Sequence, residues 1–417
     1  MMNDETTTNP TDRVALAYSG GVDTTACIPY LRHEMRCSYI VALLVDLGQS
    51  EDLEALRQKA LGAGADRAIV VDSRSTLASD YALRAIAANA VYDHHYPLCS
   101  ALGRPLIASE LVRIAHEHGC GAVAHGSTGK GNDQVRFDLA IRLLDPKLKV
   151  LAPARVWDFS RADTIKYSMK YGIAPHVTTE KPWAIDMNIL GRNVEAGPLE
   201  DLEWEPTEEV WHLVDNPESC PDVGEYVSIT FHSGRPTAVN GVDLSAFDLF
   251  QTLNAIGGRN GVGRVDMIEN RVLGIKSREL YEVPGLHLLL TAHREIENLT
   301  LPADILAQKA ALEPTYARLI YDGMWFSLLR EALDSFIDCT DRYVTGEVTM
   351  KLFKGSCTVV RRNVPKGLYR HHLVTYGSES QFNQSSAEGF IDIFGLSNRV
   401  WSEVHSDDSK ALSQRNS

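Results

Sequence analysis

Short apolar runs alternate with amphipathic segments between residues 13 and about 175. The apolar runs have the length of buried strands, and the segments between them repeat their apolar positions with helical spacing. This alternation favours an α/β fold with a doubly wound parallel sheet. We expect strands at Val14–Tyr18, Tyr39–Asp46, Ala68–Asp72, Ala122–His125 and Lys149–Leu151, and helices at Ala26–Arg32, Glu51–Leu61, Leu77–Ala90, Leu106–His118, Gln134–Leu144 and Arg161–Tyr171.

The regular alternation ends near Glu180, and an acidic, irregular stretch follows. Beyond it, strands and helices no longer take turns, which is typical of an α+β domain. We expect strands at Glu225–His232 and Val272–Ile275, helices at Ala246–Ile256 and Leu319–Asp338, and a hairpin formed by Glu347–Phe353 and Cys357–Val360.

The composition narrows the class of protein. The chain has 417 residues, enough for two domains, and a net charge of −14, which argues against a nucleic-acid partner. No apolar run is long enough to span a bilayer, and the first twelve residues lack the apolar core of a signal peptide. The seven cysteines form no Cys-x-x-Cys pair, so we expect neither a disulfide framework nor a zinc site, and we predict a cytoplasmic protein without a membrane partner.

A glycine-bearing loop, Ala17-Tyr18-Ser19-Gly20-Gly21-Val22-Asp23-Thr24-Thr25, joins the first expected strand to the first expected helix. Paired glycines let backbone N–H groups approach a ligand, and the positive end of the helix dipole points the same way. Such a loop favours binding of a phosphate chain. It resembles the pyrophosphate-binding loop of the ATP pyrophosphatase superfamily, whose enzymes split ATP between its α- and β-phosphates.

A second polar loop, His125–Arg136, follows the strand expected at Ala122–His125. The carboxyl ends of parallel strands meet at one edge of a sheet, where ligands bind. We therefore expect both loops to face one site.

The string Thr128-Gly129-Lys130-Gly131-Asn132-Asp133-Gln134-Val135-Arg136 resembles the signature of the argininosuccinate synthase family. Further strings along the chain also resemble that family: Asp46-Leu47-Gly48-Gln49, Tyr96 with Arg104-Pro105, Pro182-Trp183, Glu195-Ala196-Gly197, Gly261–Arg271, Lys276-Ser277-Arg278 with Tyr281-Glu282, and Ala387–Ile391. These ordered matches cover nearly the whole chain.

The resemblance implies an AMP-forming carbon–nitrogen ligase of arginine biosynthesis. Members of the family adenylate the ureido oxygen of citrulline with ATP, releasing pyrophosphate, and the amine of aspartate then displaces AMP. Positioning and electrostatic stabilisation carry such a reaction, so no covalent catalytic residue is implied. Mg²⁺ on the phosphates is also implied, whereas a metal site built from protein ligands alone is not.

The resemblance assigns ligands residue by residue. It implies that ATP contacts Ala17, Tyr18, Ser19, Gly20, Gly21, Val22, Asp23, Thr24, Thr25, Val45, Ala124, His125, Gly126, Ser127 and Lys130. It implies that aspartate contacts Thr128, Asn132 and Asp133. The positions implied to contact citrulline are Tyr96, Ala101, Asn132, Arg136, Ala184, Asn193, Glu269 and Tyr281.

Three citrulline positions depart from the family pattern, which has serine where this chain has Ala101, Ala184 and Asn193. Each lost hydroxyl removes hydrogen bonds worth roughly 0.5–1.5 kcal/mol. One hypothesis is an argininosuccinate synthase in which neighbours or waters compensate. The alternative is a paralogous ligase that couples aspartate to a different ureido, amide or carboxyl acceptor.

Two other classes of protein share some of these sequence features. Enzymes that modify tRNA resemble the first loop, but the acidic charge and the lack of paired cysteines argue against them. A catalytically dead paralogue that serves as a binding protein would explain the three lost serines, but the ATP and aspartate positions are intact.

The pattern along the chain gives the domain organisation. We expect a disordered lead at residues 1–12, a nucleotide-binding domain at 13–175, a synthetase or substrate domain at 176–364, and a C-terminal arm and tail at 365–417. The family implies a homotetramer in which this arm reaches over a neighbouring subunit.

Overall fold

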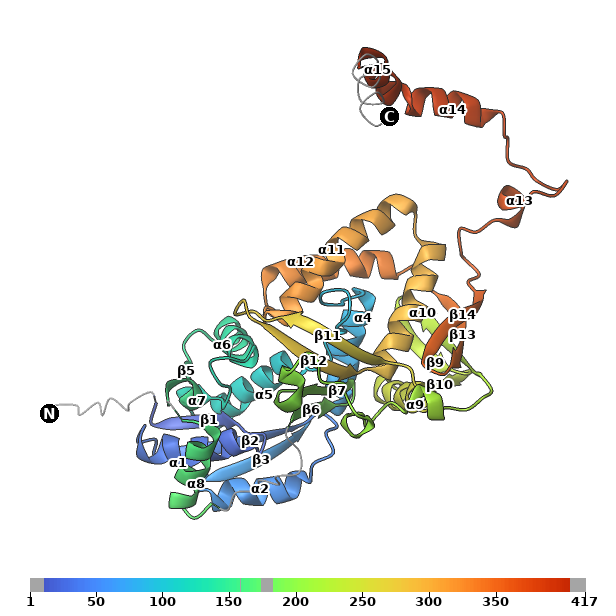
Figure 1. Ribbon diagram of the computed structural model, residues 1–417. Helices are drawn as coiled ribbons and strands as arrows, with labels where there is room; N and C mark the ends of the chain where they lie inside the picture. The colour runs from blue at the N-terminus through green and yellow to red at the C-terminus, as the bar shows by residue number, and fades with distance from the viewer. Residues whose placement is uncertain (1–10, 158, 174–182, 406–417) are drawn as a thin grey trace, which may run out of the picture. The chain divides into compact units, whose positions relative to one another are not determined.

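The computed structural model describes residues 11–157, 159–173 and 183–405 (Figure 1). Most of the predicted lead, the predicted boundary at residue 175, Pro182 and the tail from Ser406 lie outside the described residues. The chain divides into a unit that ends at Gly367 and a second unit that begins at Leu368.

Five parallel strands in the order β3-β2-β1-β4-β5 form the first sheet. They are β1 (Arg13–Ala17), β2 (Tyr39–Asp46), β3 (Arg67–Asp72), β4 (Ala122–Ala124) and β5 (Lys149–Leu151). The helices of this region are α1 (Val22–His33), α2 (Leu53–Gly62), α3 (Arg74–Thr76), the π-helical turn η1 (Leu77–Ala82), α4 (Leu83–Ala87), α5 (Gly103–Glu117), α6 (Asp133–Leu144), α7 (Pro153–Val156) and α8 (Arg161–Lys170).

Both faces of the inner strands β1 and β2 are buried. Along β1, Ala15 and Ala17 belong to one apolar cluster, whereas Val14 and Leu16 belong to another on the opposite face. Successive side chains of a strand point to opposite faces, so a strand covered on both sides reads as a continuous apolar run. The predicted doubly wound α/β fold is therefore confirmed.

Two antiparallel sheets follow within the same unit. One has the order β11-β12-β7-β6 and the other has the order β10-β9-β8-β13-β14. Their strands are β6 (Ala184–Asn188), β7 (Gly191–Glu195), β8 (Glu225–His232), β9 (Arg235–Val239), β10 (Val242–Asp243), β11 (Arg264–Asn270), β12 (Lys276–Glu282), β13 (Gly346–Phe353) and β14 (Ser356–Asn363). The helical elements are η2 (Gly197–Glu200), η3 (Glu208–Val210), η4 (Pro217–Ser219), α9 (Ala246–Arg259), α10 (Pro284–Thr300), α11 (Ala303–Tyr321) and α12 (Leu328–Asp341).

Two of the predicted elements are wrong. The expected strand Val272–Ile275 is the turn between β11 and β12, where Gly274 has a φ of +80° and its N–H donates to the Arg271 carbonyl at 2.9 Å. The expected helix Leu319–Asp338 is broken into α11 and α12. The break contains Gly323, with a φ of +81°, where a Cβ would lie 2.5 Å from the Arg136 Cα. Close backbone approach, which periodicity does not report, ends α11.

The second unit contains α13 (His371–Val374), α14 (Ser386–Phe394) and α15 (Leu396–Val404). Large apolar side chains of α14 and α15 are exposed, including Phe390, Phe394 and Trp401. The described cysteines, all seven of the chain, are free. None of the described helices combines the length and apolar character needed to cross a membrane.

Candidate functional site

The first glycine loop turns directly from β1 into α1. Gly20 has a φ of +78°, and the helix begins after Gly21. The hydroxyls of Ser19 and Thr24 lie 3.1 Å apart, and Lys59 of α2 donates from Nζ to the Gly20 carbonyl at 2.7 Å. This hydrogen bond fixes the Gly20 carbonyl on Lys59, while the start of α1 supplies backbone N–H groups and a positive dipole end.

A cleft of about 550 Å³ opens at this end of the sheet. Ser19 of the first loop and Asp133 at the start of α6 both border it. Its other lining residues include Ala17, Tyr18, Gly20, Gly21, Val22, Asp23, Thr24, Val45, Arg104, His125, Gly126, Ser127 and Asp186. The two glycine loops therefore face one cavity, as the strand order predicts.

The remaining predicted ATP and aspartate positions do not border the cleft. Thr25 and Ala124 are buried behind the loops, and the Thr25 hydroxyl donates to the Gly20 carbonyl at 3.3 Å. Thr128 and Lys130 are exposed on the second loop.

Five of the predicted acceptor positions form one connected group. The rings of Tyr96 and Tyr281 stack with centroids 4.0 Å apart, and the Tyr281 hydroxyl donates to Glu269. Glu269 also accepts from the Asn132 amide at 3.0 Å, while the Tyr96 oxygen accepts from the backbone N–H of Ala101 at 3.1 Å. Residues of β11 and β12, of the loop before α5 and of the loop that ends at α6 thus meet beside the nucleotide cleft.

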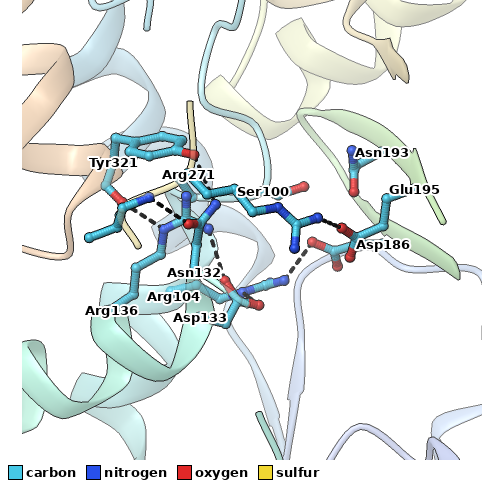
Figure 2. Close-up of polar contacts among 12 residues, drawn as sticks. Ser100, Arg104, Asn132, Asp133, Arg136, Asp186, Asn193, Glu195, Arg271 and Tyr321 are labelled. Carbon is cyan, nitrogen blue, oxygen red and sulfur yellow. Dashed lines mark hydrogen bonds and ion pairs between the residues drawn. The ribbon is translucent and has the colours of Figure 1, made fainter. Parts of the chain in front are cut away.

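Arg104 of α5 connects the cleft to this group. Its Nε donates to Asp133 at 2.8 Å and its Nη2 donates to Asp186 at 2.7 Å (Figure 2). Asp133 also accepts from Arg136 Nη1 at 2.9 Å, and Arg136 donates from Nε to the carbonyl of Tyr321 at 2.8 Å. Burial raises the pKa of the Asp133 carboxyl, but Arg104 and Arg136 outweigh it and hold that pKa below its usual range.

A second ionic group includes the departure at Asn193. Arg271 Nη2 lies 2.5 Å from Glu195 and 2.9 Å from Glu279, and the Asn193 amide donates to Glu279 at 3.1 Å. Burial, together with the negative charge of Glu279, raises the pKa of Glu195 to about 7. Ala184 pairs with Glu195 across β6 and β7, so this departure also lies at the edge of the group.

Several residues to which the sequence analysis assigned no function hold the side chains of the site in place. Arg104 and Glu195 belong to strings that resemble the family, and this could have indicated a role for both residues. Arg271 ends another such string. Asp186 and Tyr321 lie far along the chain from Arg104 and Asn132, the residues they contact, and no local pattern marks them.

Comparisons with known proteins agree with the fold. The model of the argininosuccinate synthase N-terminal HUP domain matches residues 13–174, and the model of the family's C-terminal domain matches residues 183–401. A U34-tRNA thiolase, NcsA from Methanococcus maripaludis, aligns with 40% of this chain and 60% of its own at 16% identity and a TM-score of 0.27, which is too distant to bear on the fold.

Curated relatives match over nearly their whole length. The argininosuccinate synthase of Acaryochloris marina is 54% identical over 391 residues, which are 94% of this chain and 98% of the relative. That of Thermosynechococcus vestitus is 54% identical with the same coverage, and that of Prochlorococcus marinus is 52% identical over 95% of this chain and 98% of the relative. The chain belongs to the argininosuccinate synthase family.

Proposed function

We propose that the protein joins citrulline to aspartate at the expense of ATP, forming argininosuccinate, AMP and pyrophosphate. The relatives named above carry the name of this activity. The observation that carries the proposal is the cleft that Ser19 and Asp133 share, because it puts a phosphate-binding loop beside a loop suited to an amino diacid.

The first loop suits the phosphates of ATP. Backbone N–H groups at the start of α1 and the hydroxyls of Ser19 and Thr24 are donors for phosphate oxygens. A Cβ on Gly21 would contact only side-chain oxygens of the same loop, at 3.5 Å and beyond, so there is room for a ligand atom. The Asp23 carboxylate also borders the cleft and, with these hydroxyls, offers the oxygen ligands that Mg²⁺ prefers. Mg²⁺, when bound, neutralises charge on the leaving pyrophosphate.

The acceptor region suits substrates that carry ammonium groups. Carboxylates outnumber guanidinium groups around Arg104 and Arg271. The carboxylates are those of Asp133, Asp186, Glu195, Glu269 and Glu279, and the guanidinium groups are those of Arg104, Arg136 and Arg271. Burial and Glu279 also raise the pKa of Glu269, which marks a shortage of positive charge. The α-ammonium groups of citrulline and aspartate supply the missing positive charge.

The residues position reactants rather than react. The ureido oxygen attacks the α-phosphorus and pyrophosphate leaves; the aspartate amine then attacks the ureido carbon, AMP leaves with that oxygen, and the amine gives up its proton. Asp133, held by Arg104 and Arg136, stands between the two substrates as a fixed charge. Preorganised charges of this kind lower the barrier without a covalent step.

The test is a pyrophosphate-release assay with each substrate omitted in turn. We expect release only when ATP, citrulline and aspartate are all present. Release with another ureido, amide or carboxyl compound but not with citrulline would reject the named acceptor. Strong, salt-sensitive tRNA binding without pyrophosphate release would instead support a tRNA-modifying enzyme.

We further propose a homotetramer, in the cytoplasm, whose subunits bury the exposed apolar side chains of α14 and α15. Phe390 and Phe394 are 62% and 77% exposed and stack with centroids 5.2 Å apart. Aromatic side chains of this kind are enriched at subunit interfaces. Light scattering at micromolar concentration should give four chains for the wild type and fewer for Phe390→Asp/Phe394→Asp. A wild-type monomer would reject the assembly.

A further inference from the structure

Asp138 is a buried carboxylate of α6 that does not border the nucleotide cleft, although it lies only five residues beyond Asp133. Its Oδ1 is 3.0 Å from Nε2 of His125, the residue that begins the second glycine loop. Its Oδ2 accepts from Arg155 Nη1 at 3.2 Å and from Arg142 Nη2 at 3.2 Å. Asp138 therefore contacts the loop on one side and two guanidinium groups on the other.

The hydrogen bonds of His125 fix its tautomer. The backbone N–H of Ser127 donates to His125 Nδ1 at 3.3 Å, so Nδ1 must carry the lone pair. The ring proton then lies on Nε2, which donates to Asp138. The ring is 1% exposed and stacks on Phe137 at 5.4 Å, so no water competes for these bonds. Asp138 thereby determines how His125 holds Ser127, which borders the cleft.

A second branch reaches the middle of the same loop. Arg155 donates from Nη1 to the Gln134 side-chain oxygen at 3.4 Å, and the Gln134 amide nitrogen donates to the Gly129 carbonyl at 2.5 Å. Asp138 holds Arg155 in place for this contact. One carboxylate thus anchors the loop both at Ser127 and at Gly129.

We propose that Asp138 is a positioning residue that holds the loop from His125 to Gly129 in its nucleotide-binding shape. The proposal rests on the proposed function and on the ATP contacts implied for His125, Gly126 and Ser127, which border the cleft. Asp138 itself touches no ligand, because His125, Gly126 and Ser127 lie between it and the cleft.

The role requires a carboxylate. Burial raises the pKa of Asp138, but the His125 hydrogen bond and the Arg155 charge outweigh it, so the group is ionised and both oxygens accept. An amide of the same shape has one acceptor and one donor. If the amide oxygen faces His125, the NH₂ group faces the guanidinium groups of Arg142 and Arg155, which are donors too. If the oxygen faces the guanidinium groups, the NH₂ group faces the His125 ring and forces that ring into the other tautomer. Either arrangement breaks one branch.

The experiment compares Asp138→Asn, Asp138→Glu and Asp145→Asn in the full chain. Asp145, at the end of the same helix, forms a matched histidine–aspartate pair at the surface, with His116 Nε2 2.8 Å from its Oδ2. The dissociation constant of Mg·ATP is measured by calorimetry, and KM for citrulline and the melting temperature are measured for each variant. We expect Asp138→Asn to weaken ATP binding about 10- to 30-fold while KM for citrulline changes less than about twofold. Asp138→Glu should recover part of the loss, and Asp145→Asn should bind ATP as the wild type does.

Arg155→Gln provides a second variant in case Asp138→Asn does not fold. The Arg155 side chain is 36% exposed, and its loss breaks only the branch to Gly129, so ATP binding should weaken about three- to tenfold. Unchanged ATP binding in Asp138→Asn, or an equal loss in Asp145→Asn, would overturn the positioning role alone. A wild-type protein that does not bind ATP would overturn the proposed function, and this role with it.

Discussion

Arg104 Nε donates to the Asp133 carboxylate at 2.8 Å and so joins α5 to the start of α6. This ion pair lies between the nucleotide cleft and the predicted citrulline positions. The same guanidinium holds Asp186 at 2.7 Å. In the proposed function, a carboxylate anchored in this way would face the substrates in a fixed orientation, which is the condition for electrostatic catalysis without a covalent intermediate on the enzyme.

Replacing Arg104 by Gln should reduce kcat/KM for aspartate about 30- to 100-fold, since hydrogen bonds to charged groups contribute roughly 1.5–3 kcal/mol. Steady-state kinetics with aspartate as the varied substrate measure the change. Arg113→Gln is the control, because Arg113 lies on the same helix but pairs with Glu110 and Glu117 at the surface. Equal effects of the two substitutions would show that Arg104 has no special place in the site.

Activity should depend on pH through Glu195. Burial and Glu279 raise its pKa to about 7, so the carboxyl is neutral below that pH and negative above it. The negative form attracts substrate ammonium groups, and KM for citrulline should therefore fall as the pH rises through about 7.

Glu195→Gln tests this directly, because its side chain stays neutral at every pH. The pH profile of KM for citrulline should become flat, whereas Glu208→Gln, at an exposed pair with Arg264, should keep the wild-type profile. A wild-type KM that does not vary between pH 6 and 8 would contradict the role of Glu195.

The stability of the fold should also depend on pH, through Asp341. Its Oδ1 is buried without a hydrogen-bond partner and lies 3.8 Å from His293 Nε2, which is also buried and without one. Burial raises the pKa of Asp341 to about 7, although Lys309 opposes the rise, and the negative charge of Glu297 adds to it. Because this pKa is higher in the folded than in the unfolded chain, the folded chain binds more protons between about pH 4 and 7. Stability from this group is therefore full below about pH 4 and is lost as the pH rises through 7, by up to about 1.4 kcal/mol per pH unit.

Asp341→Asn should remove this loss. The His293 ring donates from Nδ1 to the Asn89 side-chain oxygen at 3.0 Å, which leaves Nε2 free to accept from the new amide. We expect the melting temperature at pH 8 to rise by at least about 2–4 °C above that of the wild type, and the two proteins to converge near pH 4. Parallel melting curves across that pH range would contradict the assignment.

The departures from the family pattern give a further prediction. Ala101 is fully buried against the Tyr96 hydroxyl, and Asn193 already donates to Glu279, so the acceptor group is connected without the missing serines. Ala101→Ser or Ala184→Ser should each change kcat/KM for citrulline by less than about tenfold, because one hydrogen bond is worth roughly 0.5–1.5 kcal/mol. A rise of more than about a hundredfold would indicate that citrulline is not the natural acceptor.

The parts that the sequence predicted are those that local patterns encode. β2, β5 and β8 have the bounds expected from their apolar runs, and the turn Lys354-Gly355, with both φ angles positive, joins β13 to β14 as the hairpin prediction required. The break at Gly323 was missed because the approach of Arg136 that requires it comes from a distant helix.

The candidate site shows the same division. The glycine loops were visible because glycines and hydroxyls gather within a few residues of one another. The residues that hold the loops were not visible in the sequence. Lys59 of α2 holds Gly20. Arg271 contacts Lys130, and Tyr321 contacts Asn132, across more than a hundred residues of sequence. Pairings of that separation depend on tertiary structure alone.

The most direct test of a shared nucleotide and acceptor site is the fate of the ureido oxygen. Citrulline labelled with ¹⁸O at that oxygen is incubated with ATP, aspartate and the enzyme, and the AMP produced is analysed by mass spectrometry. We predict that AMP carries one ¹⁸O atom, since the oxygen attacks the α-phosphorus and leaves with it. Unlabelled AMP, or AMP that takes its oxygen from ¹⁸O-labelled water, would contradict the claim that the two loops bring ATP and citrulline together.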